Sequence, residues 1–116
     1  MEQMNKVELR GIVGNSSYQK VGDHSVIRFS LVTKRVYRDA SGEDKVESTW
    51  HNVNAWEGST VPDAEFIKKG AKLQVIGRIR NTKVQNPGQP DRYFSEIQAS
   101  EVKVYGKDET LAEEMN

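Results

Sequence analysis

Cysteine is absent from the 116 residues, and histidine occurs only at His24 and His51. Without cysteine the chain can form neither a disulfide nor a thiolate metal site, and two histidines alone are too few for a zinc site. The sequence also lacks a phosphate-binding glycine loop, a nucleophile elbow and a zinc motif. We therefore expect no metal, no cofactor and no catalytic residue, and we expect that the protein is not an enzyme.

Long apolar segments are missing as well. Residues 1–6 have no apolar core of the kind found in a secretory signal, and no run approaches the roughly 18 apolar residues of a membrane helix. Neither export by that route nor insertion into a membrane is expected. Since nothing suggests an oxidising compartment, a cytoplasmic location fits best.

An excess of charge of one sign is absent too, because 17 basic residues balance 17 acidic ones. A net charge of zero argues on its face against a nucleic-acid partner. The charges are unevenly distributed, however: residues 1–106 carry 16 Lys and Arg against 13 Asp and Glu, whereas residues 107–116 carry one Lys against four acids. We predict one mildly basic domain over residues 1–106 and an acidic, disordered C-terminal tail over residues 107–116.

What the sequence does contain is a series of segments with the alternating pattern and β-branched residues of strands. Hydrophobic residues make up only 35% of the chain, which favours a small barrel or sandwich. Phe29, in the second of these segments, is predicted to lie in the core of the barrel or sandwich. Strands are predicted at residues 5–15, 25–37, 46–56, 72–84 and 93–105, with polar turn residues at 15–23 and 38–44.

One short helical signal lies at residues 60–70. Thr60 or Ser59 suits a cap, Pro62 the first turn and Gly70 the left-handed stop, which predicts about two helical turns with Phe66 in the core. Three strands, a short helix and two more strands are the order of an oligonucleotide/oligosaccharide-binding (OB) fold, an all-β, five-stranded Greek-key barrel with one short helix between strands 3 and 4. An immunoglobulin-like sandwich would need about seven strands.

The third predicted strand carries both tryptophans of the chain. Trp50 and Trp56 are six residues apart, so on an unbroken strand they share a face with serine and asparagine side chains. Such a face is too polar for a core and too aromatic for an idle surface, although burial in the barrel is the alternative for each indole. Tyr93 and Phe94 are adjacent and must face opposite ways, and one of them could also present its ring.

Five blocks of the sequence stand in an order and spacing that point to one family. They are NKVEL at 5–9, YRD and SGE within 37–43, TWHNV at 49–53, KGAKLQVIGRIR at 69–80, and DRY and EI within 91–97. Together they resemble the bacterial single-stranded DNA-binding protein family. The resemblance implies an OB barrel that binds single-stranded DNA with little sequence preference and without catalysis. It also implies a homo-oligomer assembled through the first strands, with a tetramer favoured and a dimer as the alternative, associated with the nucleoid.

The resemblance also carries the stacking positions of the family onto this chain. Three of them fall on Tyr37, Trp50 and Trp56, and a fourth falls on Val84, which is not aromatic. An aromatic side chain stacks on bases of any sequence and contributes about 1–3 kcal/mol to binding. The resemblance therefore implies three stacking side chains here and none at Val84.

Basic residues near these positions are candidates for phosphate contacts. Arg78 and Arg80 share a face, which favours a phosphate track over the alternative of a merely solvated charged surface. The full set is Lys34, Arg35, Arg38, Arg78, Arg80, Lys83 and Arg92.

Two alternatives stay open at this stage. One is a dimeric primosomal accessory protein, since such proteins share the barrel. The other is an OB module that binds RNA or a protein partner. The family usually ends in an acidic tip with Pro and Phe that recruits repair and replication proteins; residues 108–116 are acidic but lack that ending, so recruitment through a tip is not expected.

Overall fold

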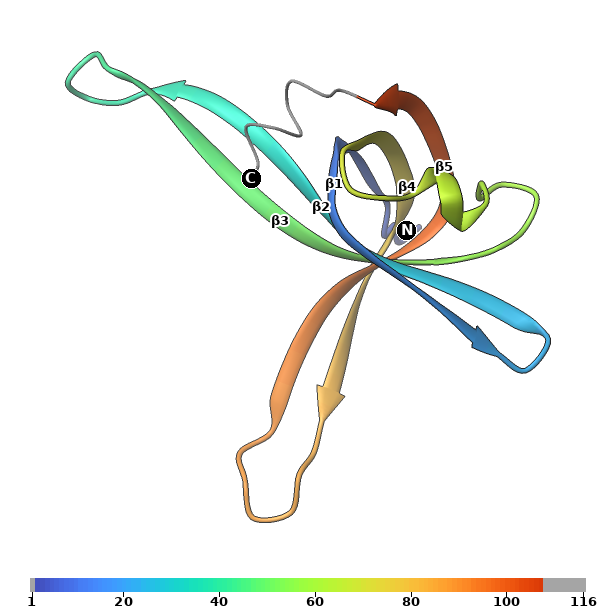
Figure 1. Ribbon diagram of the computed structural model, residues 1–116. Coiled ribbons are helices and arrows are strands. Elements are labelled where there is room, and N and C mark those ends of the chain that lie inside the picture. The colour runs from blue at the N-terminus through green and yellow to red at the C-terminus, as the bar shows by residue number, and fades with distance from the viewer. Residues whose placement is uncertain (1, 108–116) are drawn as a thin grey trace.

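Five long strands form the protein, as a computed structural model that describes residues 2–107 shows. They close into a barrel in the order β1-β2-β3-β5-β4 (Figure 1), which confirms the predicted five-stranded OB barrel. All neighbours are antiparallel except β3 and β5, whose short parallel pairing of Val53–Ala55 with Ile97–Ala99 closes the barrel. The elements are β1 (Val7–Val21), β2 (His24–Arg38), β3 (Asp44–Trp56), the 3-10 helix η1 (Ala64–Phe66), β4 (Ala71–Val84) and β5 (Arg92–Lys107).

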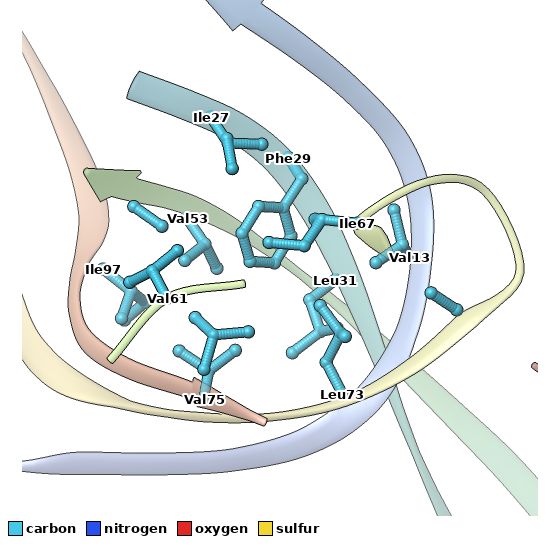
Figure 2. Packing of buried hydrophobic residues seen from close by; sticks show 13 residues of the cluster. Val13, Ile27, Phe29, Leu31, Val53, Val61, Ile67, Leu73, Val75 and Ile97 are labelled. Carbon is cyan, nitrogen blue, oxygen red and sulfur yellow. The ribbon is translucent and has the colours of Figure 1, made fainter. Parts of the chain in front are cut away.

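The core fills the inside of the barrel with branched apolar side chains from every strand (Figure 2). Alternate residues of β2, Ile27, Phe29 and Leu31, all point inward, because successive side chains on a strand face opposite sides. Val53 and Ala55 do the same on β3. The predicted burial of Phe29 is therefore confirmed, and the residues between these positions are left for the outer surface.

The predicted turn at residues 15–23 is wrong for most of its length. β1 continues to Val21 and pairs with β2 as far as Val21↔His24, so only Gly22 and Asp23 form the turn. Gly22 has φ +61°, the left-handed value that a tight hairpin turn requires. Residues 15–21 are all exposed, so this part of β1 has no buried face to produce an alternating pattern.

The predicted two-turn helix is also wrong, since only Ala64–Phe66 form a single 3-10 turn. Thr60, the expected cap, instead bonds to β5: its hydroxyl donates to the Ser100 carbonyl at 2.7 Å, and its own carbonyl accepts from the Val102 amide at 2.9 Å. A segment fastened to a neighbouring strand cannot coil freely, and a helix this short has little to nucleate it.

Phe66 does not lie in the core, contrary to the prediction. Its side chain is 51% exposed, whereas the next residue, Ile67, is completely buried and closes the mouth of the barrel (Figure 2). The 3-10 turn ends at Phe66 and thereby directs Ile67, and not Phe66, inward.

Three hairpins extend beyond the barrel as two-stranded arms (Figure 1). We call them the β1–β2 arm, the β2–β3 arm and the β4–β5 arm, after the strands that form them. At the tip of the β2–β3 arm, the Asp39 carboxylate accepts hydrogen bonds from the Ser41 hydroxyl at 2.7 Å and from the amides of Ser41 and Glu43 at 3.0 Å. These hydrogen bonds hold the pKa of Asp39 below its usual value, and the bond from the Ser41 hydroxyl has the largest effect.

β5 extends to Lys107, the first residue of the C-terminal tail predicted at residues 107–116. The remainder of that prediction concerns residues 108–116, which lie outside the described residues.

Candidate nucleic-acid interface

Both indoles lie on the outside of the barrel, on the side of the sheet that we call the outer face. Trp50 is 55% exposed and Trp56 is 45% exposed, so neither is part of the core. Each is paired across the ladder with a buried valine of β2, Trp50 with Val32 and Trp56 with Val26. Directly paired residues lie side by side on one face, so each indole has apolar support from its neighbour and leaves ring surface in solvent.

Trp50 is seated on a glycine of β1. A Cβ atom added to Gly14 would lie 2.4 Å from Cζ3 and 2.8 Å from Cη2 of Trp50, well inside contact distance. Beside it, the Ser30 hydroxyl accepts a hydrogen bond from the Asn15 amide at 3.0 Å. The outer face at this point is thus made by three strands, with the glycine providing the space that the ring occupies.

A polar hollow lies over β1, β2 and β3, at positions of β3 that fall between Trp50 and Trp56. Its centre is the cross-strand pair Arg28↔Asn54, and the Arg28 guanidinium is steadied by donating to Gln19 Oε1 at 3.0 Å. The residues that line this part are Asn15, Ser16, Ser17, Arg28, Phe29, Ser30, Asn52, Val53 and Asn54.

Arg28 and Asn54 also line a second hollow, beside Trp56, so the two hollows form one groove. His24 lies at its end with its ring edge-on to Trp56, the ring centroids 6.4 Å apart. The residues of this part are Val26, Arg28, Asn54, Trp56, Arg80, Thr82, Glu96 and Gln98. All five strands therefore contribute residues to the groove, and Trp56 lines one end of it.

Glu96 holds three of these strands together. One of its carboxylate oxygens accepts from the Asn54 amide group on β3, and the other accepts from the Thr82 hydroxyl on β4 at 3.0 Å. Arg80 is its direct partner across the β4–β5 ladder. The carboxylate therefore holds the polar side chains of Asn54 and Thr82 in place within the groove.

The predicted basic residues divide between the two sides of the sheet. The direct pairs Lys34↔Ser48, Arg78↔Gln98, Arg80↔Glu96 and Val84↔Arg92 place Lys34, Arg78, Arg80 and Arg92 on the side of the tryptophans. Among residues 2–107 no acidic side chain forms an ion pair with any of these four. They are available to a ligand with negative charge.

The other three predicted basic residues are ion-paired. Arg38, on the tryptophan side, bonds to Asp44 at 3.3 Å, and Arg35 bonds to Glu47 at 3.3 Å. Lys83 pairs with Asp91 at 3.2 Å and shares the opposite side of the β4–β5 arm with Tyr93. These pairs are exposed and are therefore weak enough to exchange for a phosphate.

Tyr37 does not join the two tryptophans. Its direct partner is Lys45, which places it on the opposite side of the β2–β3 arm from Trp50. The Arg35 guanidinium lies over its ring, 5.2 Å from the centroid. The ring is accessible, but a single nucleic-acid strand that contacts both Tyr37 and Trp50 has to cross the edge of the arm.

Arg28 is the groove residue that the sequence analysis missed. It alternates with Ser30 and Val32 along β2, so a pattern of side chains pointing away from Phe29 identifies its face. Only the cross-strand register puts it opposite Asn54, between the two tryptophans.

His51 lies on the inward side of β3, where its Nε2 atom is 2.9 Å from the Thr33 hydroxyl. Burial lowers its pKa from the usual 6.5, because a charged imidazolium is poorly solvated there. His51 is therefore a hydrogen-bonded residue of the strand.

Neither a metal site nor a membrane-spanning helix is found among residues 2–107. Residues 2–107 contain no group of three or more side chains placed to hold a metal ion. Within the same range no helix has the length and apolar character needed to cross a membrane.

Comparison with known proteins places this geometry in a family. Residues 4–105 match the single-strand binding protein family. "Single-stranded DNA-binding protein 1" of Chlorobaculum tepidum is 27% identical over 106 residues, which are 89% of this chain and 65% of that protein. "Single-stranded DNA-binding protein 1" of Xylella fastidiosa strain 9a5c is 32% identical over 111 residues, 92% of this chain and 81% of that protein. The chain spans about 60–65% of the length of several other such relatives, including that of Neisseria meningitidis serogroup A at 29% identity.

Solved structures share the fold. The Plasmodium falciparum SSB in a complex with ssDNA superposes with a TM-score of 0.75 at 23% identity, covering 93% of this chain and 98% of that one. A deletion mutant of the single-stranded DNA binding protein from Thermus aquaticus gives a TM-score of 0.71 at 19% identity, covering 87% of this chain and 50% of that one. The match over residues 4–105 and the relative at 32% identity confirm the resemblance that the sequence motifs indicated, and the chain belongs to the single-strand binding protein family.

Proposed function

We propose that the chain binds single-stranded DNA along the outer face, with little preference for sequence and without catalysis. The observation that carries this proposal is the pair of exposed indoles on one side of β3, together with a polar, partly cationic groove that is lined by the residues between them and reaches Trp56. Six residues of strand separate Trp50 from Trp56, roughly 20 Å of extended backbone. Every base has a flat aromatic face, so rings at this spacing hold unpaired bases of any identity.

Phosphate contacts supply the second part of the binding energy. Cations on the outer face that have no ion pair among residues 2–107 include Arg28, Lys34, Arg78, Arg80 and Arg92. Arg35, Arg38 and Lys83 join them after exchanging their exposed acidic partners for phosphate, and Tyr37 supplies a third ring where the strand passes over the β2–β3 arm. The names of the bacterial relatives and the complex of the Plasmodium SSB with ssDNA support the same ligand.

The biological role that follows is the protection of exposed single strands during replication, recombination or repair, in the cytoplasm and on the nucleoid. We propose a homo-oligomer, with a tetramer favoured over a dimer. Light scattering of the purified protein distinguishes these states, and a dimer would favour the primosomal accessory role.

The direct test is a titration with oligo-dT followed by selectively excited tryptophan fluorescence, which reports Trp50 and Trp56 because the chain has no other tryptophan. We expect quenching, and we expect Trp50→Ala and Trp56→Ala each to weaken binding by about 1–3 kcal/mol while the Phe variants retain most of it. Saturable binding with unquenched tryptophans would contradict stacking. Competition by oligo-U at equal concentration would favour RNA, and no binding of either would favour a protein partner.

A further inference from the structure

Phe94 is an exposed aromatic residue that the fold itself does not use. It lies on β5 in the β4–β5 arm, and 50% of its side chain is exposed. Among residues 2–107 no other ring and no cation stacks on it; the aromatic and cation contacts there involve Trp56, Tyr105 and Tyr37. A large apolar ring left in water has an unfavourable free energy, which a ligand can relieve by covering it.

The register of the arm places Phe94 on the outer face. Phe94 pairs directly with Thr82, as Glu96 does with Arg80 and Gln98 with Arg78. Thr82 and Glu96 line the groove beside Trp56, so Phe94 lies one step beyond them on the same face. The adjacent Tyr93 pairs with Lys83 and faces the other side.

Phe94 also lies next to Val84, the position at which the resemblance to the family implies a stacking ring. Val84 pairs with Arg92, and Phe94 is therefore its diagonal neighbour on the same face, at roughly 7–8 Å between backbone positions. At that separation an aromatic side chain reaches the surface above Val84. Arg92 and Arg80 flank the ring on the two strands and can hold the phosphates of a base that rests on it.

We propose that Phe94 is a base-stacking platform of this interface, and that it replaces on β5 the ring that is absent at Val84 on β4. The proposal rests on the proposed function, since it names a residue of that same site. A platform at Phe94 extends the path of the bound DNA strand from Trp56 over the groove and onto the β4–β5 arm, which points away from the barrel (Figure 1).

The test compares Phe94→Leu with Tyr93→Leu in oligo-dT titrations of the full chain. Both variants remove one exposed ring from neighbouring positions of β5, but only the first removes it from the outer face. We expect Phe94→Leu to weaken binding of long oligonucleotides about fivefold to hundredfold, and Phe94→Trp to restore it. The shortest oligonucleotides that still quench Trp50 and Trp56 should bind both variants as they bind the wild type.

A direct readout uses Phe94→Trp in a background of Trp50→Phe and Trp56→Phe, in which position 94 carries the sole indole. Quenching by long oligo-dT is expected. The proposal is overturned if this indole is unquenched, if Phe94→Leu binds like the wild type, or if Phe94→Leu changes the mass of the oligomer, which would assign the ring to a subunit contact. Failure of the wild type itself to bind oligo-dT would instead overturn the proposed function.

Discussion

Trp50 on β3 rests on Gly14 of β1, so closely that a Cβ atom at position 14 would lie 2.4 Å from the ring. The position of this indole is therefore set by a strand to which β3 is not hydrogen-bonded. Gly14 lies within the register shift between Val13 and Ser16, which lets β1 curve as the barrel closes.

Gly14→Ala should displace the indole of Trp50 and weaken oligo-dT binding by about 1–2 kcal/mol, because the ring can no longer lie in its present seat. The matched control is Gly58→Ala, since a Cβ atom there would meet nothing within 4 Å. Fluorescence titration measures both affinities, and far-ultraviolet circular dichroism checks that the barrel is retained. Equal affinities for the two variants would mean that the seat does not position the ring.

The double variant Arg78→Gln, Arg80→Gln should lower the salt dependence of DNA binding. For single strands the slope of log K against log salt is about −0.7 per phosphate contacted, so loss of two contacts reduces its magnitude by about 1.4. The control is Lys68→Gln, Lys103→Gln, which removes the same charge from residues outside the groove beside the tryptophans. An unchanged slope in the first variant would remove Arg78 and Arg80 from the phosphate path.

His51 should make the folded state less stable as the pH falls. Burial lowers its pKa below 6.5, so beneath that pH the unfolded chain binds a proton that the folded chain does not. The free energy of unfolding is therefore fully retained above about pH 6.5 and decreases as the pH falls toward the lower, folded-state pKa. Urea unfolding without DNA between pH 7.5 and 5.5 measures this, and His51→Gln should flatten the dependence.

Ile67→Ala should destabilise the barrel by about 2–5 kcal/mol, because it opens a cavity at a completely buried position. Phe66→Ala should cost less than about 1 kcal/mol, since that ring is half exposed. Urea unfolding at neutral pH compares the two adjacent variants. The reverse order would show that Phe66, as the sequence suggested, is the residue that closes the core.

The strands and the two tryptophans could be predicted from the sequence because burial on one side leaves a period-two pattern. Val53 and Ala55 point inward and the tryptophans outward, as the alternation along β3 indicated. Residues 16–20 of β1 gave no such signal, since both sides of that ribbon are exposed and its residues are those of a loop. The same absence of burial explains why β1 was predicted to end too early.

The helix prediction was wrong because local caps were outweighed by tertiary contacts. Thr60 has the residue type of a cap but is hydrogen-bonded to β5, and Val61 and Ile67 are both buried, so the segment spans the barrel mouth between two anchored points.

The positions of Tyr37 and Arg28 relative to the tryptophans depend on which residues of β2 lie opposite which residues of β3. That register is a long-range property, and no pattern within a single strand determines it.

The three arms should open locally more readily than the barrel. Beyond the barrel each arm is a ribbon of two strands with exposed side chains, among them Val36 and Val46 on one arm and Tyr93 and Phe94 on another. Isolated two-stranded hairpins are marginally stable, so the amides of the outer arms should exchange with deuterium long before those of Leu31 or Val75. A bound strand that covers the arms would slow their exchange selectively, and the free energy spent on ordering them would be subtracted from the affinity.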